Sequence, residues 1–542
     1  MQKMSWPPHQ TSMPPRSLFV RQRASGASTG IWLALLAGAL QAACLAWPTA
    51  VPAGLAALGV QQGQPLWWGQ TLALAVLVQL LLASRSPRRA AWLGWLFATS
   101  WLACTFAWLF TSMHTYGGLA APLAVLAVLL LAAVLALYYA AASWCFRALA
   151  LENIGQAAIV FISLWLLAEA ARGMLLTGFG WGAVGYAQVN GPLAAALPWV
   201  GLYGVSALAA GLAVLLALSF RATRWRQALS SVLAMAVLLV LVAVLPAPQG
   251  HDTGKLSVTL LQGNIAQEEK FESSSGVPKA LRWYGEQLNA SKSSLIITPE
   301  TALALLPEQL PEGYWAALQR RFAAGDQAAL VGLPLGSFEA GYTNSVVGLK
   351  PGQTTPWRYD KHHLVPFGEF IPPLARWFTN LMQIPLGDFN RGALPQPTFD
   401  WQGQRLATSI CYENLFGEEL GAAFVDAAKA PTMLVNISNL GWFGERLAMD
   451  QHLQIARLRS LEFDRPFLLA TNTGRTALVD HRGQVTAALP NHVAQALHLQ
   501  VQGREGITPY AWWVSRWGQW PLVILSLLIL VFVLGLRQRQ KA

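Results

Sequence analysis

The sequence predicts a polytopic α-helical membrane domain of about eight spans, with an α/β domain inserted before the last span. Two observations favour this fold class. The 542 residues are 54% hydrophobic and only 12% charged, whereas an ordinary soluble domain has roughly 25% charged residues. The hydrophobic residues are also unevenly distributed, because the long apolar runs end near residue 250 and one more run stands at the C-terminus.

Eight apolar segments have a length close to the roughly 20 residues that a helix needs to cross a bilayer. Core helices of a soluble protein are shorter, so that alternative is disfavoured. The first segment begins about thirty residues into the chain and is followed by further spans, so we expect an anchor and not a cleaved signal peptide. The expected spans are residues 30–48, 66–83, 91–112, 120–142, 157–178, 193–218, 228–246 and 521–536.

The basic residues predict the orientation of these spans. Lys and Arg occur in both tails and in the second, fourth and sixth loops, but the loops around 49–65, 113–119 and 179–192 contain neither. Because cytoplasmic loops carry the excess of Lys and Arg, both termini are expected in the cytoplasm and the α/β domain outside it. The net charge of +11 is spread loop by loop, which disfavours a nucleic-acid-binding surface.

The segment from 252 to 508 alternates short strands with amphipathic helices. Strands that are apolar on both faces and separated by helices predict a largely buried α/β sheet. Four tryptophans follow this segment and predict an interfacial belt beside the last span. They are Trp512, Trp513, Trp517 and Trp520. The expected strands are 255–265, 294–301, 328–336, 343–350, 405–410, 432–438 and 466–473, and the clearest helices are 277–291 and 447–463.

Cys411 is a candidate nucleophile. It is the only cysteine outside the long apolar runs, in the stretch RLATSICYENLFGEEL (405–420), so it has no disulfide partner within its domain. Such a thiol outside the cytoplasm is either buried, as a small core residue, or used. A strand that runs into a helix-prone segment favours use, because the helix N-terminus would stabilise a thiolate. Glu418 and Glu419, further along, are expected on a solvated face.

Two other stretches supply the groups that a nucleophile needs. Glu300 follows an apolar strand in IITPETA, and Lys361 and Glu369 lie in RYDKHHLVPFGEFIPP, which is too rich in Pro, Gly and aromatic residues for a plain helix. Each charge alone would be read as a solvated loop residue. Together with Cys411 they predict one site with a base and a group that holds an oxyanion.

The ordered set TPE (298–300), DKHHLVPFGEF (360–370) and ICYE (410–413) resembles the Glu–Lys–Cys signature of the nitrilase, or carbon–nitrogen hydrolase, superfamily. The motif HLVPFGE, together with seven spans before the domain and one after it, resembles the apolipoprotein N-acyltransferase family in particular. The likeness covers nearly the whole chain, including residues 175–206. It implies an α-β-β-α sandwich for the inserted domain.

The resemblance also implies roles for individual residues. Glu300 matches the general base, Lys361 the group that stabilises the tetrahedral intermediate, and Cys411 the nucleophile. Glu369 matches a second acid near these three, and Glu413 matches a further position that the family needs.

The reaction implied by the resemblance moves an acyl chain from the sn-1 position of a phospholipid, typically phosphatidylethanolamine, onto Cys411 as a thioester. The chain then passes to the α-amino group of the diacylglyceryl-cysteine of a lipoprotein. Because thioester to amide is downhill, no nucleotide, cofactor or metal is expected. The partners are the phospholipid donor and the lipoprotein acceptor, and a monomer in the bacterial inner membrane is favoured.

The implied organisation has five parts. They are a cytoplasmic tail (1–29), a seven-helix membrane domain (30–248), a periplasmic nitrilase-like catalytic domain (249–508), the aromatic belt with the eighth helix (509–536), and a second cytoplasmic tail (537–542).

One departure from the family wording occurs in SNLGWFG (438–444), where Leu440 stands in place of the usual acid. Trp442 and Phe443 are retained. One interpretation is that they line an acyl pocket or a mobile loop over it, and the other is that they belong to an ordinary aromatic core. Tyr412 matches in type, and packing is expected for it.

The sequence also contains patterns typical of other sites and functions. His362 and His363 beside an acid suggest a metal site, but no H-x-x-H or C-x-x-C spacing accompanies them. Glu169 and Arg172 suggest an ion path, although a local pair at the membrane surface is favoured. Two other function classes stay open: a membrane-tethered amidase whose acceptor is water, and a transporter or scaffold without catalysis.

Overall fold

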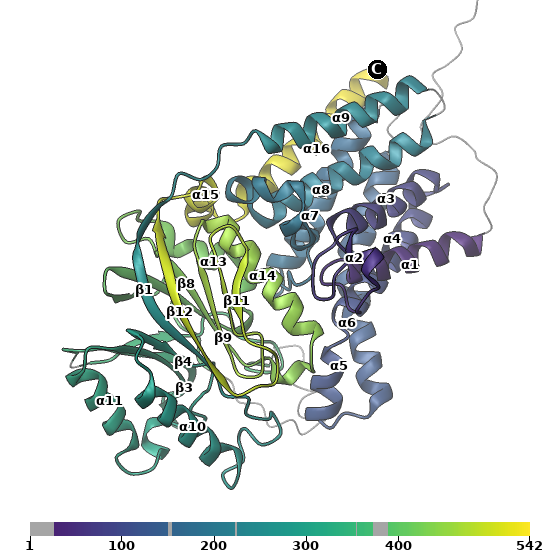
Figure 1. Cartoon of the computed structure of the whole chain (residues 1–542). Helices are drawn as coiled ribbons and strands as arrows, with labels where there is room; N and C mark the ends of the chain where they lie inside the picture. Colours follow the sequence, from purple (N-terminus) through teal and green to yellow (C-terminus); the bar gives the residue numbers. More distant parts are fainter. Residues whose placement is uncertain (1–26, 150–153, 223–224, 354, 372–388, 542) are drawn as a thin grey trace, which may run out of the picture.

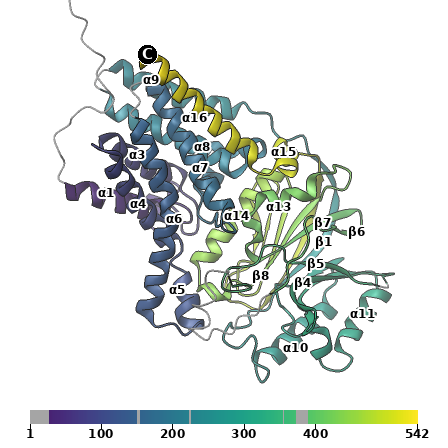
Figure 2. The same ribbon diagram turned by 180° about the vertical axis from the view of Figure 1, so that it is seen from behind.

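The computed structural model describes residues 27–149, 154–222, 225–353, 355–371 and 389–541. The apolar helices gather at one end of the molecule and two β-sheets at the other (Figures 1 and 2). The last helix returns to the helical end, so the C-terminus lies far from the sheets. Most of the N-terminal tail, with its predicted orienting cations, lies outside the described residues.

Each of the eight apolar segments forms a helix. Among the described residues, five helices are long and apolar enough to cross a membrane, namely α6, α7, α8 (with the turn before it), α9 and α16. A sixth results if α4 and the segment to Tyr116, bent by 62°, are one span, whereas α1 and α3 are shorter. The count of eight spans therefore stays a prediction. The helices are α1 (Ala27–Ala43), α3 (Trp67–Ala83), α4 (Pro87–Thr105), α6 (Ala121–Leu149), α7 (Ile154–Met174), α8 (Leu197–Arg221), α9 (Trp225–Ala243) and α16 (Trp520–Lys541).

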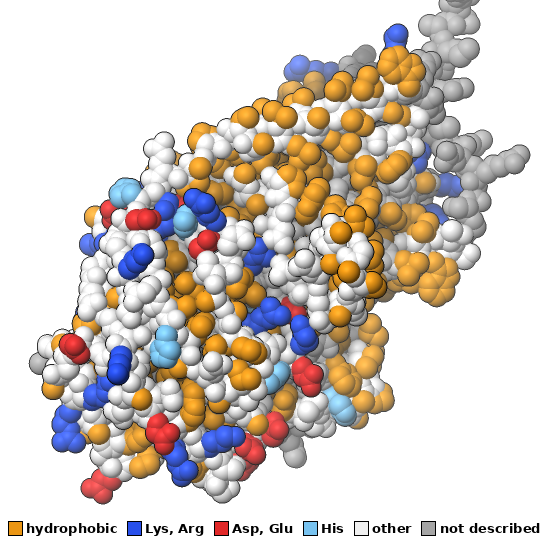
Figure 3. Space-filling model, in the orientation of Figure 1, with side chains coloured by type: hydrophobic (Ala, Val, Ile, Leu, Met, Phe, Trp, Pro, Cys, Tyr) orange, Lys and Arg blue, Asp and Glu red, His pale blue; other side chains and the backbone are white. Residues whose placement is uncertain are grey.

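The surface of the molecule divides in the same way. Hydrophobic side chains cover the helical end in Figure 3, whereas acidic and basic side chains gather over the sheets. Helix α16 exposes long apolar side chains such as Leu528 and Phe532. Exposed apolar side chains gathered in this way are typical of a surface in contact with lipid.

Glu169 and Arg172 do not form the surface pair that the sequence suggested. Both side chains are fully buried. Arg172 donates from Nη1 to the carbonyl of Trp181 (2.8 Å), and Glu169 accepts the N–H of Val184 (2.9 Å). The pair therefore fixes the loop between α7 and α8, because its hydrogen bonds satisfy buried backbone groups of that loop.

Two six-stranded sheets form the inserted domain. In each sheet a parallel core of three strands, β1-β2-β3 or β7-β8-β9, is flanked by antiparallel strands. The first sheet has the order β12 (Gln495–Glu505), β1 (His251–Gln262), β2 (Leu295–Ile297), β3 (Ala328–Ser337), β4 (Gly341–Leu349), β5 (Trp357–Asp360). The second has the order β11 (Val485–Ala488), β10 (Ala477–Val479), β9 (Phe467–Thr471), β8 (Met433–Ser438), β7 (Gln404–Ile410), β6 (Phe399–Trp401).

Successive residues of a strand face opposite sides of its sheet. One side packs against the other sheet and the other side packs against helices, so the domain has four layers. Ile297 of β2 and Ile437 of β8 share the core between the sheets. Ile296, the neighbour of Ile297, faces the helices over the first sheet, and Leu434 faces those over the second. The predicted α-β-β-α sandwich is therefore confirmed. The covering helices are α10 (Gly276–Ala290) and α11 (Tyr314–Ala324) on one side, and α13 (Gly417–Gly421), α14 (Leu447–Phe463) and α15 (Pro509–Trp517) on the other.

All seven expected strands are present, as β1 to β4 and β7 to β9. The expected strand at 294–301 ends early, at Ile297, because the following Thr-Pro-Glu segment leaves the sheet. Helix α15 packs on α8 and donates from Trp513 Nε1 to the carbonyl of Trp199 (2.9 Å). Trp512 and Trp517 are about half exposed, so their role as an interfacial belt stays a prediction.

Candidate active site

Glu300, Lys361 and Cys411 come together between the two sheets. Lys361 directly follows β5 and Cys411 directly follows β7, while Glu300 lies three residues beyond the end of β2. Lys361 Nζ is 3.4 Å from Glu300 Oε1, and the charges of both residues act on the Cys411 thiol. The exposed fractions of the three residues are 7%, 1% and 7%. Three groups expected from distant parts of the sequence thus share one buried site.

Two carboxylates and one amide surround the lysine. Lys361 Nζ donates to Glu369 Oε1 at 2.8 Å, and Asn344 Nδ2 donates to Glu300 Oε1 (2.7 Å) and to Glu369 Oε1 (2.9 Å). Burial lowers the pKa of Lys361, but the charges of Glu369 and Glu300 outweigh it and hold this pKa well above its usual value. The site therefore contains a permanent cation, which can stabilise an oxyanion.

Both oxygens of the Glu300 carboxylate have fixed partners. Oε1 faces Asn344 and Lys361, and Oε2 accepts the backbone N–H of Asn439 at 2.9 Å. A carboxylate held on both sides keeps one rotamer, and this orientation is what a proton acceptor needs beside a nucleophile.

Cys411 sits at a strained turn. Its φ of +57° lies in the left-handed region, which non-glycine residues adopt at a cost of about 1–3 kcal/mol and mostly at functional positions. The chain bends here from β7 into a 3₁₀ turn (Cys411–Leu415), and Asn436 of β8 donates to the Cys411 carbonyl (2.8 Å).

The expected helix after Cys411 is only this 3₁₀ turn followed by the five residues of α13. So short a segment adds little dipole. Burial raises the pKa of Cys411, and the charge of Glu300 raises it further against the opposing effects of Lys361 and the N–H of Tyr412. The resting form is therefore the thiol, and a base must take its proton.

Glu413 connects the cysteine turn to the loop after β5. It is 3% exposed. Its Oε2 accepts the N–H of Ile410 (2.6 Å) and the hydroxyl of Tyr359 (2.9 Å). Its Oε1 accepts the N–H groups of His362 (2.7 Å) and His363 (3.0 Å). Burial raises the pKa of Glu413 to about 7, while the His363 N–H lowers it. The side chain therefore holds the cysteine turn and the loop after β5 together.

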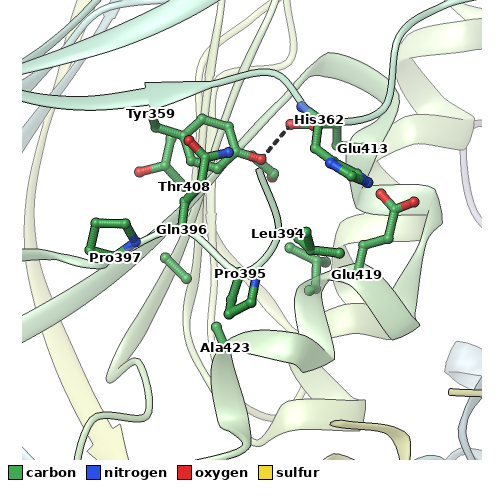
Figure 4. Close-up of a pocket in the computed structure, with 13 residues that line it drawn as sticks. Tyr359, His362, Leu394, Pro395, Gln396, Pro397, Thr408, Glu413, Glu419 and Ala423 are labelled. Atoms are coloured by element: carbon green, nitrogen blue, oxygen red, sulfur yellow. Dashed lines mark hydrogen bonds between the residues drawn. The ribbon is translucent and has the colours of Figure 1, made fainter. Parts of the chain in front are cut away.

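A cavity of about 40 Å³ lies beside Glu413 and is drawn in Figure 4, where Tyr359, Glu413 and Glu419 stand on its wall. This volume has room for a few water molecules. It is far too small for an acyl chain, so this cavity is not a substrate pocket.

Glu419 does not lie on a solvated face. It is half-buried, and its Oε1 is 2.7 Å from Nδ1 of His363, whose ring stacks on Phe416 at 3.6 Å between centroids. Tyr412 is buried as expected, and its hydroxyl donates to the carbonyl of Leu364 (2.9 Å). Both side chains brace the loop that follows Lys361.

Trp442 and Phe443 meet aromatic residues from the helical part of the chain. Phe443 packs edge-on against Trp108 (4.7 Å between ring centroids), and Trp442 packs edge-on against Tyr116 (5.7 Å). An acyl-pocket role for the pair stays a prediction. Leu440 is 1% exposed and lies in the turn after β8, in the hydrophobic core that the sheets share with the apolar helices.

Sequence reasoning missed three residues of the site. Asn344 looked like an ordinary strand residue. Lys270, in the polar loop QEEKFESSSG, looked solvated, but its Nζ donates to the Glu300 carbonyl at 3.0 Å. His452 lies on α14 with Nε2 3.3 Å from the Cys411 carbonyl.

The metal interpretation gains no support. His362 Nδ1 lies 2.8 Å from the carbonyl of Gly392, and His363 turns instead to Glu419. In the part of the chain that the structure describes, no group of three His, Cys, Asp or Glu side chains could hold a metal ion.

Comparison with known proteins agrees with this geometry. Residues 52–215 match the family model of the apolipoprotein N-acyltransferase N-terminal domain, and residues 257–502 match the carbon–nitrogen hydrolase model. The chain is 54% identical over 514 residues to the apolipoprotein N-acyltransferase of Verminephrobacter eiseniae, covering 90% of this chain and 92% of that protein. The chain belongs to the apolipoprotein N-acyltransferase family.

A second relative agrees with the assignment. The apolipoprotein N-acyltransferase of Ralstonia nicotianae is 42% identical, with 88% of this chain and 90% of that protein covered. Solved structures with a partial likeness include Nit3 of Saccharomyces cerevisiae, at 14% identity and a TM-score of 0.35, with 46% of this chain and 90% of that one covered. An amidase of the nitrilase superfamily from Nesterenkonia AN1 has 15% identity and a TM-score of 0.35, with 48% and 95% covered.

As a member of the apolipoprotein N-acyltransferase family, the chain is an acyltransferase that N-acylates lipoproteins. Its substrates are accordingly lipid and lipoprotein. The interpretation as a non-catalytic transporter or scaffold is therefore rejected.

Proposed function

We propose that the chain transfers an acyl group from the sn-1 position of a phospholipid, phosphatidylethanolamine in particular, to the α-amino group of the N-terminal S-diacylglyceryl-cysteine of an apolipoprotein. The observation that carries the proposal is the buried cluster in which Lys361 faces Glu300 at 3.4 Å beside the Cys411 thiol. These are a cation, a base and a nucleophile, which acyl transfer through a covalent intermediate requires.

The first half of the reaction acylates Cys411. Glu300 takes the thiol proton as the sulfur attacks the ester carbonyl, because the raised pKa of Cys411 leaves little thiolate at rest. The Lys361 ammonium stabilises the oxyanion of the tetrahedral intermediate. When this intermediate collapses, the C–O bond of the ester breaks, the leaving lysophospholipid oxygen receives the proton from Glu300, and a thioester remains.

The second half transfers the acyl chain to the amine. The α-amino group of the lipoprotein attacks the thioester carbonyl, and Glu300 accepts the proton that the nitrogen loses. Collapse of the second tetrahedral intermediate breaks the C–S bond, and the sulfur recovers its proton from Glu300. The products are the amide and free enzyme, so the two substrates use one site in turn.

Glu369 and Glu413 have supporting roles in this proposal. Glu369 pairs with Lys361 at 2.8 Å and keeps the ammonium in place. Glu413 fixes the cysteine turn against the loop after β5 through its backbone hydrogen bonds. Neither carboxylate needs to touch the substrate.

The proposed location is the bacterial inner membrane, with both termini cytoplasmic and residues 249–508 periplasmic. The apolar helices and the basic residues of alternate loops support it. Protease treatment of spheroplasts is expected to cut within 249–508 and to leave the C-terminal tail protected. Cleavage that requires membrane disruption would contradict this orientation.

The test of the mechanism uses the purified full chain in detergent with phosphatidylethanolamine labelled in its sn-1 acyl chain. The intact mass is expected to increase by one acyl group, and a diacylglyceryl peptide should then remove that group and gain an amide-linked chain. Cys411→Ala should abolish both steps, and Cys104→Ala, at an exposed thiol, should abolish neither. Release of free fatty acid alone in the presence of the peptide would instead support a hydrolase.

A further inference from the structure

Lys270 is a buried cation with no part in the mechanism above. It lies in the loop between β1 and α10 and is 2% exposed. Its Nζ donates to the Glu300 carbonyl (3.0 Å) and to Thr301 Oγ1 (3.4 Å). Within the described ranges, no carboxylate lies within salt-bridge distance of it. Burial of a lysine without an ion pair is costly, so packing alone is a poor reason for this side chain.

Lys270 contacts the backbone of Glu300, the proposed base. Thr301 has a φ of +46°, a conformation that is unfavourable for a β-branched residue. The Lys270 ammonium bonds to the Glu300 carbonyl and the Thr301 hydroxyl, so it holds this strained turn from one side. Asn344 and Asn439 hold the Glu300 carboxylate from the other side. The base is thus fixed at both its backbone and its side chain.

The charge of Lys270 also reaches the nucleophile. Burial lowers the pKa of Lys270 to about 8, while the charges of Glu300 and Cys411 raise it. The side chain is therefore mostly cationic at neutral pH. When Cys411 becomes a thiolate, its negative charge raises the pKa of Lys270. A second cation also balances the site, where Lys361 alone faces two carboxylates. The charges that act on Lys270 are those of Glu300 and Cys411, and Glu300 in turn pairs with Lys361. Glu268, Glu269 and Glu272 lie on the same loop as Lys270.

We propose that Lys270 is a positioning residue for acyl transfer, whose ammonium fixes the turn that carries Glu300 and whose positive charge favours the Cys411 thiolate while the proton leaves. This inference rests on the proposed function of the site. It assigns Lys270 no contact with the substrate.

The test compares two substitutions in the full chain from which Cys44, Cys104 and Cys145 have been replaced by alanine. Lys270→Met keeps the length of the side chain and removes the charge, whereas Lys270→Arg keeps a charge that does not titrate in the accessible range. Lys279→Met, at an exposed position of α10, is the matched control. The readouts are iodoacetamide alkylation of Cys411 against pH, and the single-turnover rate of acyl-enzyme formation from phosphatidylethanolamine.

Lys270→Met is expected to slow both alkylation and acylation at pH 7 by at least about tenfold, because one unit of thiol pKa corresponds to a tenfold change in thiolate. The wild-type acylation rate is expected to decline above pH 8 as Lys270 loses its proton. The Lys270→Arg variant should form the acyl-enzyme at neutral pH and should lack this decline. Lys279→Met should match the wild type. Wild-type alkylation and acylation profiles for Lys270→Met would overturn the inference, as would a variant that is merely less stable with an unchanged thiol pKa. Failure of the wild type to form an acyl-enzyme would refute the proposed function instead, because alkylation reports on Cys411 without any substrate.

Discussion

Lys361 lies closer to Glu369 than to Glu300, with Nζ–Oε1 distances of 2.8 Å and 3.4 Å. The tighter ion pair therefore belongs to the carboxylate without a proposed proton-transfer role. This division leaves Glu300 less strongly bound to the cation and so better able to accept a proton from the thiol.

Replacing Glu369 by glutamine should slow acyl-enzyme formation by about 10²-fold, the scale of loss when one preorganised electrostatic group is removed. The amide has the same shape but no charge, so Lys361 should move towards Glu300. The stronger ion pair would make Glu300 a poorer proton acceptor. Single-turnover acylation measures the effect. Glu312→Gln, at an exposed position, is the control, and an unchanged rate in Glu369→Gln would contradict the division of roles.

Glu413→Gln should destabilise the fold and misplace the nucleophile. The carboxylate accepts four hydrogen bonds. In the glutamine variant the NH₂ group replaces one oxygen, so the two donors that bonded to that oxygen lose their acceptor. The expected cost is about 2–4 kcal/mol, measured as a lower Tm of the detergent-solubilised protein. Tyr359→Phe removes only one of the four donors, so it should lower Tm less. Equal Tm values for all three proteins would refute the bracing role.

The pair of His363 and Glu419 should be neutral at pH 7. Burial lowers the pKa of His363 to about 4 and raises the pKa of Glu419 to about 8. A carboxyl whose pKa is raised on folding binds its proton more tightly in the folded state. Its contribution to stability is therefore complete below about pH 4.5 and is lost as pH rises towards 8, at about 1.4 kcal/mol per pH unit.

Glu419→Gln should accordingly keep the wild-type Tm at pH 7, because a neutral amide can donate the same hydrogen bond to His363. The variant should also lose part of the decline in Tm between pH 5 and pH 8. The comparison of the two proteins isolates this residue from other titrating groups. A large loss of Tm at pH 7 would show instead that the pair is ionic.

Leu440→Asp should lower stability without raising activity, although it restores the acid of the family wording. Leu440 is 1% exposed in the hydrophobic core that the sheets share with the apolar helices, and a carboxyl without a partner there costs several kcal/mol or stays protonated. Thermal unfolding and the transfer rate are the measurements. Faster transfer at an unchanged Tm would show that the acid has a functional position here after all.

Gln451→Leu should weaken the junction between the sandwich and the helical part. Gln451 Oε1 accepts the indole N–H groups of Trp108 (3.0 Å) and Trp181 (2.7 Å), and each buried N–H left without an acceptor costs about 1–3 kcal/mol. The Tm should fall, and Trp181→Phe in the same chain should restore part of it. Gln500→Leu, at an exposed position of β12, should change Tm little. Strict additivity of the two junction substitutions would contradict the shared hydrogen bond.

The sequence predicted the secondary structure well where local pattern decides it. The apolar segments of about 20 residues became helices, and the runs rich in Val, Ile and Leu became strands, because hydrophobic periodicity is itself the physical cause of those elements. The prediction failed after Cys411, where ENLFGEEL forms a 3₁₀ turn and α13 instead of one helix. There the chain follows the hydrogen bonds of Glu413, which come from the loop some fifty residues earlier.

The sequence by itself determined which residue types stand at the ends of β2, β5 and β7, and family wording suggested their roles. Only the tertiary structure decided the protonation states of these side chains and which residues surround them. Lys270 and Glu419 look like solvated charges in the sequence, yet one is buried against the backbone of Glu300 and the other against His363. Burial depends on the packing of segments that are separated in the sequence, by 30 residues for Lys270 and Glu300 and by 56 for His363 and Glu419. Burial in turn raises the pKa of the Cys411 thiol. Local sequence carries no record of that packing, so the protonation of the site had to come from the fold.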